Sequence, residues 1–335
     1  MDNQQPTEKK TKRKLNYHRV IPIALGILIL IILIIGVVRL IIWNQGQEYI
    51  IDESVDVESE PEDLIFFMDP SIYTDNNDDG KLTILALGND TLAYDKGGIN
   101  IAEQIAEQTG ATVYNCALEG SYMAALQPTV TNIEENPLDA FSFFWISDSI
   151  QTGNWDLQYK ALPLLPDNID KKSYTETIDF MKTIDYASVD LLIIYYDGHD
   201  YLNRNPIANP TNIYDVTTME GSFTGCFERY PINYPNMQAM LISPTFCYVT
   251  TEDGKLEGCD LADLGHGNLP TCMTTLQTQA QNYGVSYVDN FYGIKINAET
   301  ADKYLLNDGI TPNDEGRIMI AERISGFINA RIIKE

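Results

Sequence analysis

The chain has 335 residues, with 22 Lys and Arg against 48 Asp and Glu, so its formal net charge is −26 at pH 7. So acidic a chain is unsuited to binding nucleic acid or an anionic membrane surface, and the sequence predicts no nucleic-acid partner. The sequence has three histidines and no Cys-x-x-Cys pair, which argues against a structural zinc site. We predict neither metal nor cofactor.

The N-terminal segment predicts a membrane anchor. Residues 1–19 form a basic tail, and an uncharged apolar run follows from Val20 to Val38, about as long as a bilayer core is thick. We place a signal-anchor helix at 20–43, because Arg39 can reach the interface, Trp43 suits it, and no cleavage site follows. Since basic flanks stay in the cytoplasm, the sequence predicts a type II single-pass cell-membrane protein with its large C-terminal part outside.

Residues 44–80 are predicted to be an acidic extracytoplasmic stalk. Residues 1–47 hold seven Lys or Arg and two acidic side chains, so they carry +5 of the charge and the remainder carries −31. The stalk is rich in acids and interrupted by Pro61 and Pro70, which favours an extended spacer. Its motif "DNNDDG" resembles the start of a calcium loop, but Ala86 stands where the bidentate Glu is required, which favours a polar turn.

Residues 81–335 are long enough for one α/β domain with a substantial core. The strands are predicted from continuous apolar runs, which are typical of a parallel sheet covered on both faces: Leu82–Leu87, Thr112–Cys116, Val189–Tyr195, Ala239–Ile242 and Val285–Val288. Predicted helices alternate with them, which indicates a doubly wound fold: Ile99–Gln108, Pro137–Ile150, Tyr174–Ile184, Thr218–Tyr230, Leu269–Tyr283 and Asp314–Ile328. In such a sheet, the loops at the carboxyl ends of the strands form the site.

Those loops carry a family resemblance. They are "GNDTLAY", "CALEGSYMA", "YDGHDYLNR" and "SPTFCYV" after the first four strands, and "LLNDGITPNDEGR" before the last helix. In this order they resemble the SGNH, or GDSL-type, hydrolases over nearly all of residues 81–335. The resemblance implies a flavodoxin-like three-layer α/β/α sandwich with a parallel sheet. It also implies hydrolysis or transfer of ester-linked acyl groups, often acetyl groups on carbohydrate.

In that family, a serine in a Gly-Asp-Ser turn attacks the carbonyl, and backbone N–H groups and an asparagine amide stabilise the oxyanion. By resemblance, Gly88 matches the first glycine of the turn, whereas Asn89 stands at its aspartate and Asp90 at its serine. Gly120 matches the glycine of the oxyanion hole. The nucleophile is therefore replaced by a carboxylate.

The remaining motifs are altered as well. Asp197-Gly198-His199-Asp200 lies where the family has Gly-x-Asn-Asp, so His199 replaces the asparagine and Asp197 and Asp200 flank it. Asp308 matches the aspartate of the family's Asp-x-x-His motif, but Thr311 stands at its histidine. Because a threonine hydroxyl is no base near neutral pH, and loss of nucleophile and base costs about 10⁶ in turnover, we interpret the usual serine-esterase mechanism as absent.

Two other chemistries stay open. Ser121 directly follows Gly120, and paired with His199 it could form a rearranged triad in which Asp90 or Asp308 orients the imidazole. Asp90 and Asp308 could instead activate water, as carboxylate pairs do in glycosidases.

Three functions follow as hypotheses, and whether the chain is an enzyme stays open among them. The leading one is a membrane-anchored, extracytoplasmic SGNH-like protein with a modified site, a pseudoenzyme that binds or processes acyl-modified cell-envelope carbohydrate. The second is an active carbohydrate esterase or acyltransferase that uses Ser121 and His199. The third is a non-catalytic structural protein of the envelope, and its partner would be another envelope protein.

Overall fold

The computed structural model describes residues 17–44, 60–67, 75–77, 79–251 and 254–331. The chain divides into two compact units, Met1–Glu58 and Ser59–Glu335. The predicted basic tail, apart from residues 17–19, and much of the predicted stalk lie outside the described residues.

In the first unit, helix α1 (Tyr17–Asn44) covers the predicted span 20–43 and contains Pro22. Its side chains at residues 17–20, 23–24 and 40–44 are outside the described part of the chain. Within the described part, no helix was found that is long and apolar enough to cross a bilayer. The membrane anchor stays a prediction.

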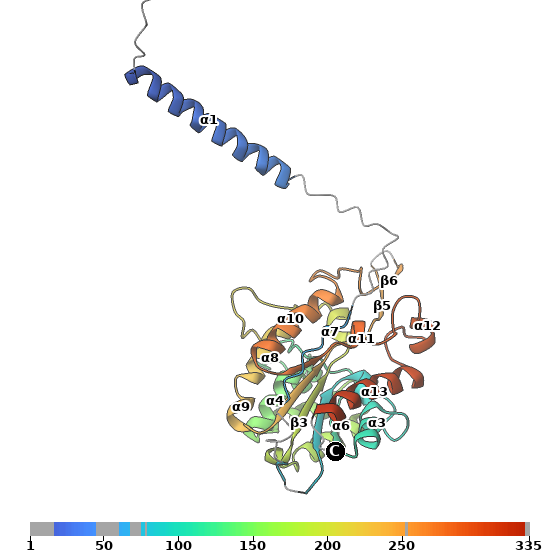
Figure 1. Ribbon diagram of the computed structural model, residues 1–335. Coiled ribbons are helices and arrows are strands. Elements are labelled where there is room, and N and C mark those ends of the chain that lie inside the picture. Colours follow the sequence, from blue (N-terminus) through green and yellow to red (C-terminus); the bar gives the residue numbers. More distant parts are fainter. Residues whose placement is uncertain (1–16, 45–59, 68–74, 78, 252–253, 332–335) are drawn as a thin grey trace, which may run out of the picture. The chain divides into compact units, whose positions relative to one another are not determined.

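The second unit is built on a five-stranded parallel sheet with the order β2-β1-β3-β4-β7 (Figure 1), which confirms the predicted parallel-sheet α/β fold. This is the flavodoxin-like order, in which β2 is added on one side of β1 and all later strands on the other, so that the strand order switches between β1 and β3. The strands are β1 (Thr83–Gly88), β2 (Thr112–Asn115), β3 (Leu191–Tyr195), β4 (Gln238–Ile242) and β7 (Ser286–Val288). Every residue of β1 and β3 is buried, as their continuous apolar runs predict for central strands.

Helices cover the sheet on both sides (Figure 1). Helix α3 (Ile101–Thr109) packs against α13 (Asp314–Arg331), while α8 (Met219–Phe227) packs against both α4 (Phe143–Thr152) and α10 (Leu269–Asn282). The remaining helices of this unit are α2 (Asp90–Ala93), α5 (Asp156–Ala161), α6 (Lys171–Met181), α7 (His199–Leu202), α9 (Tyr230–Asn233), α11 (Asn290–Gly293) and α12 (Ala301–Tyr304), with 3₁₀ turns at Pro137–Phe141, Leu162–Leu164 and Tyr186–Ser188.

Two local expectations differ from the structure. The predicted helix Pro137–Ile150 is a 3₁₀ turn followed by α4, because Ser142 between them has extended backbone (φ −62°, ψ 157°). The predicted loop after β4 contains a two-stranded antiparallel hairpin of β5 (Tyr248–Thr250) and β6 (Leu256–Gly258). Val249 in β5 is buried.

The compact unit also begins earlier than the predicted boundary at Lys81. Leu64 forms an antiparallel bridge with Tyr287 of β7, and Asp63 forms an ion pair with Arg323 of α13 at 2.6 Å. Closer to β1, the buried carboxylate of Asp190 accepts hydrogen bonds from the backbone N–H groups of Asn76 and Thr83. These segments belong to the folded domain, because they form hydrogen bonds and an ion pair with the sheet and with α13. The acidic composition of residues 44–80 does not reveal these contacts.

Candidate functional site

The last residue of β1 is Gly88, and no other residue fits there, because a side chain has no room. A Cβ atom on Gly88 would lie 2.1 Å from the carbonyl oxygen of Tyr195 on neighbouring β3. The next residue, Asn89, is fully buried and joins the two strand ends: its Nδ2 donates to Asp197 Oδ1 at 2.9 Å, and its Oδ1 accepts from the Asp197 N–H at 2.9 Å. The loops after β1 and β3 are thus held together directly beneath the site.

Asp197 is the most highly coordinated side chain of the site. Its Oδ1 accepts hydrogen bonds from Asn89 Nδ2, from the His199 N–H and from His199 Nδ1, the last at 2.6 Å. Its Oδ2 accepts from the N–H and the hydroxyl of Thr91. Burial alone would raise the pKa of Asp197, but the bonds from His199 and Thr91 and the charge of His199 hold it below the usual value. Asp197 is therefore a buried, ionised anchor for His199.

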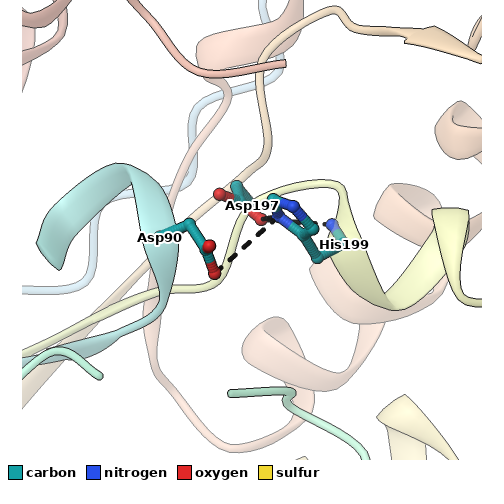
Figure 2. A group of neighbouring side chains, drawn as sticks. All are labelled: Asp90, Asp197 and His199. Carbon is teal, nitrogen blue, oxygen red and sulfur yellow. Dashed lines mark hydrogen bonds and ion pairs between the residues drawn. The ribbon is translucent and has the colours of Figure 1, made fainter. Parts of the chain in front are cut away.

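Asp90 lies at the start of α2, beside His199 (Figure 2). Its Oδ2 accepts a hydrogen bond from the N–H of Gly120 at 2.8 Å and lies 4.0 Å from His199 Nδ1. Burial and the charge of Asp197 raise the pKa of Asp90 to about 6, against the opposing effects of His199 and the Gly120 N–H. Asp90 is therefore a carboxylate that ionises near physiological pH.

His199 begins α7 and completes the group. Burial lowers its pKa, but the hydrogen bond and charge of Asp197, with the charges of Asp90 and Asp200, outweigh burial and raise the pKa to about 9. The imidazole is thus protonated at neutral pH. The side chains of His199 and Asp90 are 29% and 21% exposed, whereas that of Asp197 is 4% exposed, so a ligand can reach the first two only.

Asp200 and Ser121 are buried, and their side chains form hydrogen bonds that hold the surrounding loops. Asp200 is fully buried and accepts hydrogen bonds from the N–H groups of Met123 and Ala124 and from Asn205 Nδ2, so it shapes the loop after Gly120. Ser121 is 1% exposed, and its hydroxyl donates to the carbonyl of Leu118 at 2.8 Å. Among the described residues, no hydrogen bond joins Ser121 to His199.

Asp308 and Thr311 belong to a separate turn that precedes α13. Asp308 is exposed, and its Oδ1 accepts from the N–H of Thr311 at 2.9 Å, while Thr311 itself is buried. The buried guanidinium of Arg317 connects this turn to the loop after α2, because it donates to the carbonyls of Pro312 and Ile99. In the described part of the chain, no hydrogen bond or ion pair joins Asp308 or Thr311 to Asp90 or His199.

Two tyrosines that could close the site differ in position. Tyr94 is 43% exposed, and the guanidinium of Arg317 lies over its ring at 4.7 Å. Tyr122 is half-buried, and burial, with the charges of Asp200, Asp90 and Asp197, raises its pKa. The charges of these three carboxylates thus reach Tyr122, whereas Tyr94 packs against Arg317.

Asp90, Asp197 and His199 each offer a ligand atom, and these atoms lie within 4.8 Å of one another. A divalent cation on His199 Nδ1 would have to displace the 2.6 Å contact with Asp197, whose oxygens are already shared among five donors. The group is thus a carboxylate–imidazole–carboxylate cluster, in which His199 is hydrogen-bonded to Asp197 and ion-paired with Asp90 at 4.0 Å. It can accept hydrogen bonds at Asp90 and donate from the imidazolium, but it holds no activated hydroxyl.

Sequence reasoning missed two residues that support the site. Thr91 donates to Asp197, and Arg317 holds the turn with Thr311. Asn89 was predicted as a site residue, but its pairing with Asp197 of the third loop is visible only in three dimensions. The signal for Thr91 was the run of small polar groups after Gly88. Arg317 carried no signal, because an arginine inside a predicted helix reads as a solvated residue.

The chain resembles known proteins in sequence and in fold. The family model for GDSL-like lipases and acylhydrolases matches residues 69–324. One crystal structure is 16% identical with a TM-score of 0.53, covering 75% of this chain and 97% of that chain. A protein from Lactobacillus plantarum is 13% identical with a TM-score of 0.50 (76% and 99% covered), and a possible lipase from Chitinophaga pinensis is 15% identical with a TM-score of 0.47 (75% and 98% covered). Comparison with curated proteins gives no match.

Proposed function

Because the chain belongs to the GDSL-like lipase/acylhydrolase family, we propose that it is a membrane-anchored, extracytoplasmic member whose modified site binds acyl-modified cell-envelope carbohydrate without serine-esterase chemistry. The observation that supports this proposal most directly is the hydrogen bond from the Gly120 N–H to Asp90 Oδ2 at 2.8 Å. By resemblance to the family, this N–H is a donor for the oxyanion. Here a carboxylate of the chain itself occupies the donor.

An ionised Asp90 has two effects on ester hydrolysis. It removes the hydroxyl that would attack the carbonyl, and its negative charge repels the oxyanion that would form beside Gly120. His199 is no substitute base near neutral pH, since with a pKa of about 9 it already carries its proton. The cluster therefore supports binding better than acyl transfer.

The chemistry of the exposed groups fits an uncharged carbohydrate. Asp90 can accept hydrogen bonds from sugar hydroxyls, and the imidazolium of His199 can donate to an acyl carbonyl oxygen. The strongly acidic chain disfavours anionic polymers. Ser121 is not favoured as a rearranged nucleophile, because its hydroxyl is buried and already bonded to the Leu118 carbonyl.

The full chain in detergent is expected to hydrolyse an activated acetyl ester no faster than buffer and to remain unlabelled by a serine-directed phosphonate. Calorimetric titration of the same preparation with an O-acetylated oligosaccharide should show binding that weakens at least about tenfold in Asp90→Ala, which removes one charged acceptor. Chemical deacetylation of the oligosaccharide should weaken binding similarly.

Ser121→Ala is the matched control and should change neither result. Rapid ester turnover that Ser121→Ala abolishes and Asp90→Ala leaves intact would make the rearranged triad correct. Inertness together with absent carbohydrate binding would favour a structural role in the envelope.

The membrane anchor has its own test. Protease added to intact cells should remove everything after about residue 50, because the basic flank before Val20 is expected to stay in the cytoplasm. A tag at the N-terminus should survive on a short membrane-bound fragment, and a tag after Glu335 should be lost. Protection of the C-terminal tag in intact cells, with digestion after lysis, would contradict the orientation.

A further inference from the structure

Two cysteines face each other at the base of the hairpin β5–β6. The pairing of Tyr248 with Gly258 places Cys247 and Cys259 directly opposite in the next position of the antiparallel ladder, and the Cys259 N–H donates to the Cys247 carbonyl at 3.0 Å. Opposite residues in such a ladder have Cα atoms about 4.5–5.5 Å apart. That spacing falls within the range of about 4.4–6.8 Å that a disulfide spans.

The side chains also meet. The backbone N–H of Cys247 lies 3.1 Å from Cys259 Sγ, and both residues are at most 1% exposed. The Cys247 thiol donates a hydrogen bond to the Cys259 side chain, and this bond, together with burial, holds the pKa of Cys247 well above its usual value. Both are free thiols in the structure, so the pair is arranged for a bond that has not formed.

We propose that Cys247 and Cys259 form a disulfide that closes the hairpin β5–β6. The oxidant is a small-molecule or protein disulfide. One thiolate attacks it and releases a first thiol, and the second cysteine then attacks the mixed disulfide and releases another, so two electrons and two protons leave the chain. In cells this rests on the proposed extracytoplasmic location, where disulfides persist.

The bond would act on the candidate site through the hairpin. Cys247 Sγ packs on Gly198, next to His199, since a Cβ atom on Gly198 would lie 3.2 Å from it. At the next position, the Tyr248 N–H donates to the carbonyl of Gly309, next to Asp308, at 2.9 Å. The hairpin thus connects the loop of His199 with the turn of Asp308. A disulfide at its base would fix Cys247 and Tyr248, which make these two contacts.

Cys272 is the competing partner. It lies in the first turn of α10, whose Leu269 N–H donates to the Cys259 carbonyl at 3.0 Å. A bond to Cys272 would join Cys259 to a helix start, whereas Cys247 lies opposite Cys259 in a ladder, and only the ladder sets the Cα separation. Cys116 and Cys226 lie after β2 and within α8.

Trypsin offers a direct test, because Lys255 lies between the two cysteines. The full chain in detergent is reduced, exposed to oxidised glutathione in sub-denaturing urea so that the buried hairpin opens, alkylated and digested. We expect peptides 230–255 and 256–295 to remain joined until reductant is added. The oxidised chain should also melt roughly 5–10 °C above the reduced chain.

The variants separate the pairings. Cys247→Ser should abolish the joined peptides and the thermal shift, whereas Cys272→Ser and the distant Cys116→Ser should keep both. Alkylated Cys247 in an unjoined peptide 230–255, or loss of the link in Cys272→Ser, would overturn the proposal. Because the assay involves thiols alone, a negative result leaves the ester and carbohydrate experiments unaffected. If the domain is not extracytoplasmic, the disulfide can still form in this assay.

Discussion

Replacing Asp197 with asparagine is expected to destabilise the domain by about 3–5 kcal/mol, the cost of removing one partner from a buried ion pair. The carboxylate accepts from five donors, which belong to Asn89, Thr91 and His199. An amide of the same shape has one acceptor oxygen, so its NH₂ group would meet donors that then lack a partner. Urea unfolding of the variant and the original chain measures the loss.

The same substitution should return the pKa of His199 from about 9 toward its ordinary value, as followed by NMR titration of the imidazole. A histidine whose folded pKa is raised contributes stability that is fully present below its unfolded pKa and is lost as the pH rises through the folded value. The original chain should therefore lose about 2 kcal/mol of stability from His199 between pH 6 and 8.5, and Asp197→Asn should lose much less.

Asp308→Asn is the matched control, because Asp308 is exposed and its hydrogen bonds to other described residues stay within its own turn. It should cost less than about 1 kcal/mol and leave the titration of His199 unchanged. If Asp197→Asn behaves like this control, Asp197 is not the anchor of His199, and the interpretation of the cluster fails.

The fold could be predicted because the strands that decide it are continuous apolar runs. Leu82–Leu87 and Val189–Tyr195 have no polar face, and only a sheet covered on both sides buries such strands completely. The hairpin β5–β6 could not be predicted, since three-residue strands carry too few positions for a period to emerge. The break at Ser142 could not be predicted either, because only its backbone angles interrupt the helical pattern.

The candidate site was predictable in position and not in electrostatics. Asp90 and His199 follow strands that are neighbours in the sheet, so their proximity follows from topology. Which of these two groups holds the proton cannot be predicted in this way, because it depends on the buried Asp197 and on the Gly120 N–H. Those contacts join residues 30 and 108 positions apart in the sequence. The placement of Thr311 relative to Asp90 stays a prediction.

Asp90→Ser combined with Thr311→His is expected to create esterase activity at least about 10²-fold above the original chain, since the double change supplies a nucleophile and a base and frees the Gly120 N–H for an oxyanion. Either change alone should do little, because nucleophile and base act as a unit. Hydrolysis of an activated acetyl ester and phosphonate labelling at position 90 are the measurements.

The structure argues for leaving Asn89 unchanged in this experiment, although the family pattern has an aspartate there. Asn89 Nδ2 donates to Asp197 Oδ1 at 2.9 Å, so Asn89→Asp would set two carboxylates against each other in a fully buried position. Adding Asn89→Asp should therefore lower both stability and the activity gained. An inert double variant that folds normally would mean that Thr311 does not face Asp90, and an unlabelled Ser at position 90 would mean that the Gly120 donor is not an oxyanion site.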